Sequence, residues 1–224
     1  MAVLPPALEN LPEEFAVFPL AGALLLPGGR LPLNIFEPRY LALVEDALAS
    51  GRMLGMVQPD KRLARGGNGP GLYRIGCLGR ISAFEESGDG RYLITLTGVA
   101  RFTLVEEVEK RRGYRRVRGA FSGFAADLQE PQAGLPFERS VLLAALRRYF
   151  AKAGVEANWD TIAQMPDAAL VVSLAMACPF DVEEKQALLE ARDEAERARA
   201  LLALLEINAF EDGHGEDDDE PKAS

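Results

Sequence analysis

The feature that most constrains the fold is a change of hydrophobic periodicity along the chain. Up to about residue 121, short β-branched and aromatic runs alternate with turns rich in glycine and proline, as in a small barrel or folded sheet. From Pro136 onward, leucines and alanines recur at spacings of three and four, which is typical of helices. The sequence therefore predicts an α+β protein, with a β-rich part over residues 14–121 and a helical bundle over residues 136–208.

Several strands are expected in the first part. Gly76 and Gly79 fall inside one of them, where glycine indicates a bulge or a tight corner. The sequence "SGDG" at 87–90 predicts a hairpin turn, and "RLARGGNGPGLY" at 62–73 predicts a flexible loop. The strands are expected at 15–20, 52–59, 72–86, 91–98, 100–109 and 113–123.

The helices carry start and stop signals. A helix is expected to begin at Pro38, whose missing N–H costs nothing in the first turn, and to stop at Gly51. Three helices are expected in the second part: 136–154, 165–179 with Asp167 as N-cap, and one from Asp181 to about residue 208. The segment 165–179 is apolar nearly all round, which predicts a central position.

The charge of the chain is concentrated in its last residues. The formal net charge is −9, and residues 211–224 hold seven acids and one lysine, so the remaining chain carries about −3. This tail is predicted to be disordered because it has little apolar surface. The only histidine, His214, lies in it, which argues against a histidine base or a histidine-bound metal. Cys77 and Cys178 lack metal-ligand spacing and are interpreted as buried reduced thiols.

Targeting and catalytic motifs are missing from the pattern. No apolar run reaches the roughly 20 residues of a membrane span, and the N-terminus lacks a basic signal region, so a cytoplasmic protein without membrane partners is expected. "RGGNGPGLYR" has glycines but no Lys-Ser/Thr pair to hold phosphates. No serine lies in a nucleophile elbow. We expect no enzyme activity, no catalytic residue, no cofactor and no metal.

A basic stretch, "KRRGYRRVR" at 110–118, allows two interpretations. Six cations around Tyr114 could meet phosphates. Alternatively, the stretch forms an exposed hairpin, in which "EEVE" at 106–109 pairs with the arginines and their stems cover apolar surface. The second interpretation is favoured, because the mildly acidic body offers no general attraction to nucleic acid.

The segment "LPLNIFEPRY" at 31–40 is one of several motifs that together resemble a known family. The order "FPLAGALLLPGG", "LPLNIFEPRY", "MLGMV", "IGCLGRI", "DGRYLITLTGVARF" and "FDVEEKQALLEARDEAERARALLALLE" resembles the N-terminal substrate-binding domain of Lon proteases over roughly residues 14 to 207. The chain looks like a standalone bacterial version without the ATPase and protease modules. Asn34 stands where a basic residue is frequent in the family.

The resemblance implies a PUA-like pseudo-barrel followed by a helical bundle. In that frame Glu37 gains about 0.3–1 kcal/mol from the dipole of the helix that starts at Pro38, and Arg39 ties the junction to neighbouring backbone. The family-motif residues expected to be structural are Pro32, Phe36, Glu37, Pro38, Arg39, Tyr40, Gly76, Gly79, Gly98 and Arg101.

The expected function follows from the resemblance and the missing catalytic set. It is a non-enzymatic module that binds polypeptides, such as unfolded or client proteins. The alternative is an RNA-binding PUA-like module that uses residues 110–118, for which fold analogy is a weak argument. DNA is not an expected partner, and the residues that would contact a polypeptide are not identified by the sequence.

Overall fold

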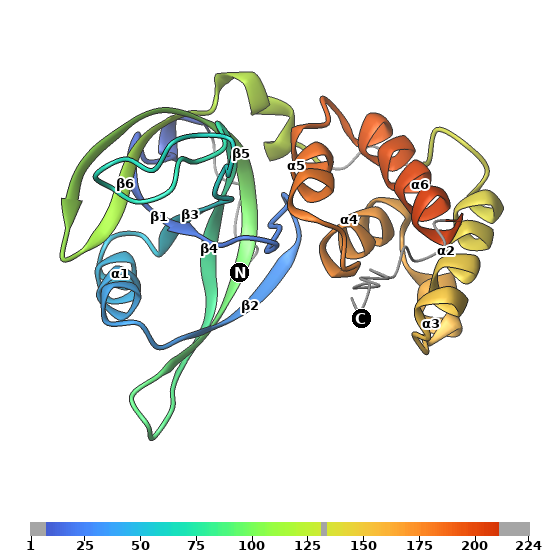
Figure 1. Ribbon diagram of the computed structural model, residues 1–224, viewed down its shortest axis with the longest axis horizontal. Helices are drawn as coiled ribbons and strands as arrows, with labels where there is room; N and C mark the ends of the chain where they lie inside the picture. Colours follow the sequence, from blue (N-terminus) through green and yellow to red (C-terminus); the bar gives the residue numbers. More distant parts are fainter. Residues whose placement is uncertain (1–7, 131–133, 211–224) are drawn as a thin grey trace, which may run out of the picture.

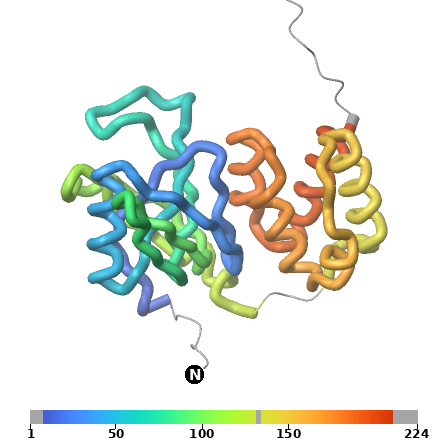
Figure 2. The backbone as a smooth tube through the Cα atoms, turned by 90° about the horizontal axis from the view of Figure 1, so that it is seen from below, coloured from blue at the N-terminus to red at the C-terminus, as the bar shows by residue number. Residues whose placement is uncertain are grey.

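A computed structural model describes residues 8–130 and 134–210, which form a mixed α+β protein with a six-stranded sheet and six α-helices in these ranges (Figure 1). The predicted disordered tail at 211–224, with His214, lies outside the described residues. Figure 2 shows the strand-rich part and the helical part side by side.

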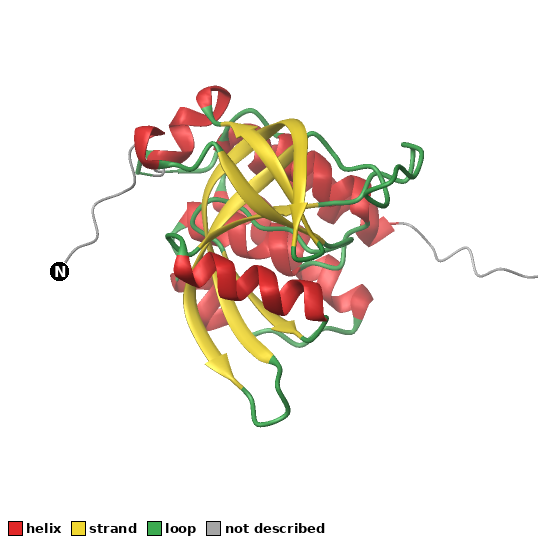
Figure 3. Ribbon diagram, turned by 90° about the vertical axis from the view of Figure 1, so that its left-hand side faces the viewer, coloured by secondary structure: helices red, strands yellow, loops and turns green. Residues whose placement is uncertain are grey.

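The sheet consists of strands whose ladder closes on itself. Their order is β2-β5-β4-β3-β1-β6, and β5 also pairs with β6, so a ring runs through β5, β4, β3, β1 and β6. Only β1 and β3 pair in parallel among these strands. Figure 3 shows the strands crossing one another instead of lying flat. The strands are β1 (Glu14–Pro19), β2 (Arg30–Ile35), β3 (Met53–Val57), β4 (Ile75–Glu86), β5 (Tyr92–Arg111) and β6 (Tyr114–Ala120).

Strand β5 corrects the expectation of two strands at 91–98 and 100–109, because it continues for 20 residues. Gly98 explains the continuity. Its N–H donates to the Gly29 carbonyl at 2.9 Å, and a side chain at Gly98 would overlap the Leu26 carbonyl. The glycine therefore admits a crossing loop without breaking the strand. In β4, register shifts at Leu78/Gly79 and Ile81/Ala83 confirm the expected irregularity.

The interior of the ring holds large apolar side chains. Along β5, Ala100 and Phe102 are buried inside the ring, whereas Ile94 and Leu96 belong to the larger core cluster that includes residues of the helices. The Phe102 ring meets Phe15 edge to face, with centroids 4.9 Å apart. Gly76 has no room for a side chain because the Phe102 ring and the Met56 carbonyl lie over it. The remaining buried members of this cluster are Leu11, Val17, Val57, Leu72, Leu78, Val117 and Phe121.

Helix α1 (Pro38–Ala49) begins and ends as predicted, with Pro38 in its first turn. Gly51 follows the helix at φ +84°, a conformation that favours glycine. Tyr40 is buried, and its ring centroid lies 4.1 Å from that of Phe18 in β1. This contact fixes α1 against the sheet.

The helical part corrects the expected centre. Helix α6 contacts α2, α4 and α5, while Ser173 and Ala177 leave one side of α4 exposed. Asp167, expected as the N-cap, is instead the first residue of α4, and Pro166 holds the cap position. The Asp167 carboxylate pairs with Arg139 of α2. The helices are α2 (Arg139–Ala153), α3 (Trp159–Gln164), α4 (Asp167–Ala177), α5 (Val182–Glu190) and α6 (Glu194–Phe210), with 3-10 helices η1 (Leu8–Asn10) and η2 (Ser122–Leu128).

The predicted single helix from Asp181 to about 208 is two helices. The capping box of Asp181 and Glu184 is present as expected. A second start follows, because the Asp193 carboxylate accepts from the N–H of Glu196 at 2.7 Å. Asp-x-x-Glu therefore occurs twice, and its second copy starts α6.

A buried polar contact joins the two parts. The Gln58 amide, at the end of β3, donates to the Val182 carbonyl of α5 at 2.9 Å and to Gln186 at 3.2 Å. Lys185 of α5 donates to the Gly22 carbonyl at 2.7 Å. The division at residues 121 and 136 stays a prediction.

Candidate functional site

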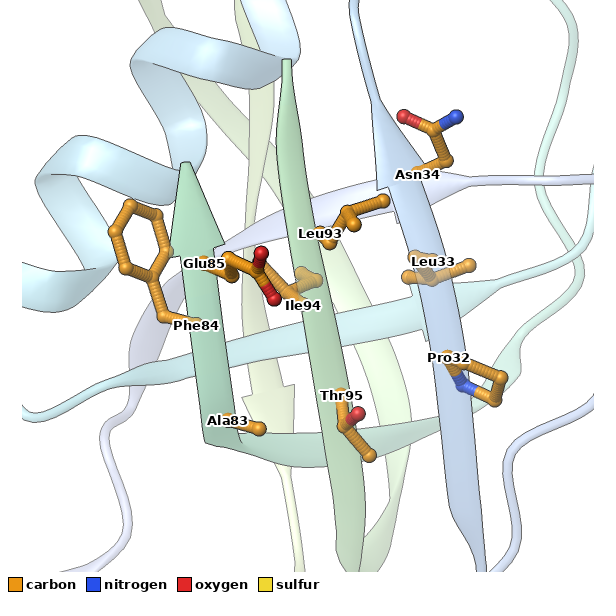
Figure 4. A pocket seen from close by; sticks show the side chains of 9 residues that line it. All are labelled: Pro32, Leu33, Asn34, Ala83, Phe84, Glu85, Leu93, Ile94 and Thr95. Carbon is orange, nitrogen blue, oxygen red and sulfur yellow. The ribbon is translucent and has the colours of Figure 1, made fainter. Parts of the chain in front are cut away.

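An open hollow lies on one face of β2, β5 and β4, here called the outer face (Figure 4). In an antiparallel sheet, directly paired residues point to the same side. Three such rows cross the face in the register of the strands. They are Arg30–Thr97–Arg80, Pro32–Thr95–Ala83 and Asn34–Leu93–Glu85.

The hollow on the outer face is open and has a volume of about 470 Å³. Leu93, on its floor, is 43% exposed. Phe36, which directly follows β2, is 61% exposed. Leu93 shares its face with Thr95 and Thr97, while the intervening Ile94 and Leu96 point into the core. Leu93 pairs with Asn34, two residues before Phe36, so both exposed apolar residues lie at the same end of β2.

Strand β2 forms the edge of this surface, because β5 is the only strand that pairs with it among the described residues. Proline cannot donate to a ladder, so in an edge strand its nitrogen points away from the neighbour. Pro32 is exposed, and the same alternation turns the backbone groups of Arg30 and Asn34 away from β5. The edge therefore presents unpaired N–H and C=O groups.

The junction motif lies beside this surface. Arg39 donates to the Glu37 carboxylate at 2.7 and 3.0 Å, and its guanidinium lies 4.6 Å from the centre of the Tyr40 ring. The expected tie from Arg39 to neighbouring backbone is therefore replaced by an exposed pair across Pro38. Glu37 holds the N-cap position without a side-chain capping bond. Nothing in this arrangement provides a nucleophile.

The basic stretch at 110–118 is paired with acids. Arg115 is nearly buried and meets Glu107 at 2.5 Å and the Pro70 carbonyl at 2.8 Å. The expected pairing of the preceding acids with some of the arginines is confirmed for Glu106 and Glu107, while Arg115 is nearly buried and not exposed as expected. The other contacts are Arg116 and Arg118 with Glu14, Arg118 with Glu106, Arg111 and Arg112 with Asp46, Arg112 with Glu45, and Lys110 with the Gly67 carbonyl.

Arg101 is buried between the two parts of the chain. It binds the Asp127 carboxylate of η2 through two nitrogens, at 2.7 and 2.9 Å. The same guanidinium donates to the carbonyls of Leu189, at 3.2 Å, and Ala191, at the end of α5. It satisfies carbonyls that a helix end leaves open. Arg101, like Gly76, Gly79 and Gly98, lies inside the fold and does not meet the outer face.

The thiols and acids offer little chemistry. Cys77 and Cys178 are buried free thiols. Burial raises the pKa of Cys178 to about 11 and also raises the pKa of Cys77, so neither is a thiolate at neutral pH. Within residues 8–130 and 134–210, no three histidine, cysteine or acidic side chains cluster closely enough to hold a metal ion. No helix in the same ranges combines the length and apolarity needed to cross a bilayer.

Sequence reasoning missed most of the outer face. Pro32 and Phe36 were singled out as structural, yet both are exposed here. Leu93 carried a signal, because the alternation over 92–97 places it on the same side as Thr95 and Thr97. No local sequence signal pointed to Arg30 or Arg80, because only the register of three strands brings them to one face.

Comparisons with known proteins agree on one family. A family model described as the "ATP-dependent protease La (LON) substrate-binding domain" matches residues 14–206. Lon protease 2 of Myxococcus xanthus is 29% identical over 219 residues, which cover 91% of this chain and 25% of that protein. The Lon protease of Syntrophus aciditrophicus is 27% identical over 210 residues, covering 88% and 25%. The chain thus spans about a quarter of the length of these relatives.

Solved structures show the same fold. A Lon N-terminal domain protein from Xanthomonas campestris aligns with a TM-score of 0.59 at 24% identity, covering 85% of this chain and 97% of that one. The N-terminal domain of the Mycobacterium avium complex Lon protease aligns with a TM-score of 0.57 at 15% identity, covering 86% and 97%.

Proposed function

Because this chain belongs to the Lon substrate-binding domain family, we propose that it is a non-enzymatic module that binds unfolded or client polypeptides on its outer face. One observation carries the choice of surface: Leu93, which lines the open hollow, and Phe36, which directly follows β2, are both exposed. Apolar contact with little charge suits segments that a folded protein would bury.

The finer architecture belongs to the same proposal. The closed ladder of β5, β4, β3, β1 and β6 supports a PUA-like pseudo-barrel, and the contacts of α6 with α2, α4 and α5 support a helical bundle after it. The boundaries 14–121 and 136–208 describe these two subdomains. A cytoplasmic location is supported by the two free thiols, since that compartment keeps cysteines reduced.

The alternative of RNA binding is not carried further. The cations of residues 110–118 meet carboxylates or, for Lys110, a backbone carbonyl. A phosphate would have to displace these partners.

The proposal is tested with a labelled, permanently unfolded protein, such as reduced and carboxymethylated α-lactalbumin. We expect saturable binding to the chain, measured by fluorescence anisotropy. Leu93→Ser combined with Phe36→Ser should weaken the affinity at least about tenfold, or about 1.4 kcal/mol. The matched control, Val105→Ser with Val141→Ser, removes apolar residues that are 54% and 42% exposed elsewhere.

Two results would contradict the proposal. The first is no binding of unfolded protein at all. The second is equal loss of affinity in the control and the outer-face variant, which would place the contact elsewhere. We also expect no ATP hydrolysis and no casein cleavage, and either activity co-eluting with the pure chain would refute a non-enzymatic module.

A further inference from the structure

We infer that the bound segment joins the sheet as an extended strand along the free edge of β2, with an acidic side chain opposite Arg30 and an apolar side chain near Leu93. This inference rests on the proposed function and names how the segment is held and which sequences are preferred. Strand addition takes its affinity from backbone hydrogen bonds and its specificity from alternate side chains.

The edge of β2 suits an added strand better than the other exposed edge. In the part of the chain that the structure describes, β2 pairs with a single strand along its whole length, while β1, β3 and β6 each pair with two. The far end of β4 also lacks a second neighbour, since β3 reaches only as far as Arg80. That end carries a bulge after Ile81 and two acids, Glu85 and Glu86, and bulges and charges are devices that protect edges. On β2, Pro32 removes one N–H only.

The unpaired backbone defines the occupant. Arg30 and Asn34 turn their N–H and C=O groups outward, and Pro32 adds a carbonyl. Only another backbone in an extended conformation matches donors and acceptors at this spacing. The occupant is therefore a stretch of polypeptide and not a helix or a folded surface.

Side chains of the added strand would alternate between the two faces of the sheet. On the outer face, the residues beside Arg30, Pro32 and Asn34 would be separated by two positions each. The residue beside Asn34 lies next to the row that contains Leu93. An apolar side chain there covers Leu93 and faces Phe36, so both exposed groups lose contact with water.

Charge determines which residue is preferred at the other end of the bound segment, beside Arg30. Arg30 and Arg80 flank Thr97 in one row, and neither forms an ion pair within residues 8–130 and 134–210. Glu85, which bears the negative charge of this face, lies two rows away beside Leu93. An acidic residue beside Arg30 is complementary to this arrangement, and one beside Asn34 would face Glu85. The preferred segment carries its acid and its apolar residue four positions apart.

The strand-addition step is tested with two labelled nine-residue peptides of threonine and serine, each with one aspartate and one leucine four positions apart, in opposite order. The better binder of the two is expected to lose at least tenfold in affinity to Asn34→Pro. That change removes an outward N–H and leaves the β2–β5 ladder intact. Asn34→Ala, which keeps the N–H, should bind within twofold of the parent chain.

The charge step is tested by pairing a variant with a peptide change. Replacing aspartate by asparagine in the better peptide should lower its affinity for the parent chain about fivefold. The same replacement should not change its affinity for the Arg30→Gln variant. Replacing Arg80 should have a smaller effect than replacing Arg30, because Arg80 lies two strands further from the edge. Circular dichroism and melting temperature must show that each variant is folded.

The outcomes separate the two levels of the hypothesis. If Asn34→Pro is folded and binds both peptides as the parent does, the strand-addition inference is wrong. If the aspartate and asparagine peptides bind equally, the acidic preference is wrong, and an Arg30-dependent preference for a terminal carboxylate would also refute the side-chain assignment. If unfolded protein still binds through Leu93 and Phe36 in these cases, the proposed function stands while the inference fails.

Discussion

The β5–β6 hairpin and the outer face of β2, β5 and β4 share one strand and differ in how they use charge. The hairpin carries six cations in residues 110–118, yet carboxylates and a backbone carbonyl occupy them. The outer face carries few charges, but Arg30 and Arg80 lie outside any ion pair of the described residues. The charge that can attract a partner is therefore the unpaired charge and not the densest charge in the sequence.

The register of the strands explains the hairpin. Glu106 lies directly opposite Arg118 across β5 and β6, and opposite charges in that position stabilise a sheet. Arg115 reaches Glu107 along the diagonal of the same ladder. The acids and bases of this stretch form a structural pattern, so changes in them should affect stability before binding.

The largest effect should come from removing the partner of the most buried arginine of the hairpin. Glu107→Leu leaves Arg115, whose side chain is 8% exposed, without its carboxylate. We expect a loss of about 2 kcal/mol in the free energy of unfolding, because an unpaired buried charge keeps its desolvation cost. Urea unfolding measures it, with Glu109→Leu on the same strand as control. A loss below about 0.5 kcal/mol would show that the hairpin pairs are dispensable.

A smaller effect is expected at Tyr114, which directly precedes Arg115 in the hairpin. Tyr114 donates to the Asp46 carboxylate of α1 at 2.6 Å. Burial raises the pKa of Tyr114 to about 12, so it is a donor at neutral pH, and its bond holds the pKa of Asp46 below the usual 3.8. Tyr114→Phe should cost about 1 kcal/mol at pH 7.

The pH dependence of this contact has a definite sign. A depressed folded-state pKa stabilises the protein above the unfolded-state pKa, near 4, and the stabilisation is lost as the pH falls through the lower folded value. The gap between the parent chain and Tyr114→Phe should therefore narrow as the pH falls below the unfolded-state pKa of Asp46. A gap in unfolding free energy that stays constant from pH 7 to pH 2.5 would contradict this linkage.

Substitutions on the outer face should hardly change the free energy of unfolding. Leu93→Ser and Arg80→Gln alter exposed side chains with few contacts, so each should shift the free energy of unfolding by no more than about 0.5 kcal/mol. Differential scanning calorimetry would measure both. A shift above about 1.5 kcal/mol would mean that Leu93 or Arg80 supports the fold, and the contrast between the two regions would disappear.

The smallest effect is expected from the hairpin arginines on binding. Arg116→Ala with Arg118→Ala should leave the affinity for unfolded polypeptide within about twofold. The affinity of the parent chain should also change little between 50 and 200 mM salt, unlike a contact with many phosphates. Loss of polypeptide binding in this variant, with a steep salt dependence, would move the binding surface from the outer face to the hairpin.

Local signals in the sequence predicted some elements well. Helix α1 followed from Pro38 and Gly51, and the start of α5 from Asp181 and Glu184, because these signals lie within a few residues of what they determine. The start of α6 had the same kind of signal at Asp193 and was overlooked because the leucine and alanine spacing continued across it.

Local sequence signals could not predict contacts between residues that are far apart in the chain. The continuity of β5 depends on a loop that packs against Gly98 from residues 26–29. The partner of Arg101 is Asp127, in a 3-10 helix that no pattern indicated. The outer face exists only once three strands are in register. Propensity describes segments, whereas these features depend on how segments meet.

Arg101 also bears on whether the chain can be divided. Arg101 belongs to β5. Its guanidinium binds the Asp127 carboxylate and donates to the Leu189 carbonyl near the end of α5. A fragment that ended before α5 would keep a buried cation whose carbonyl acceptors had been cut away. We expect the strand-rich part, expressed without the helices, to unfold more easily than the whole chain. A change of secondary structure along a sequence thus need not mark a place where the protein can be cut.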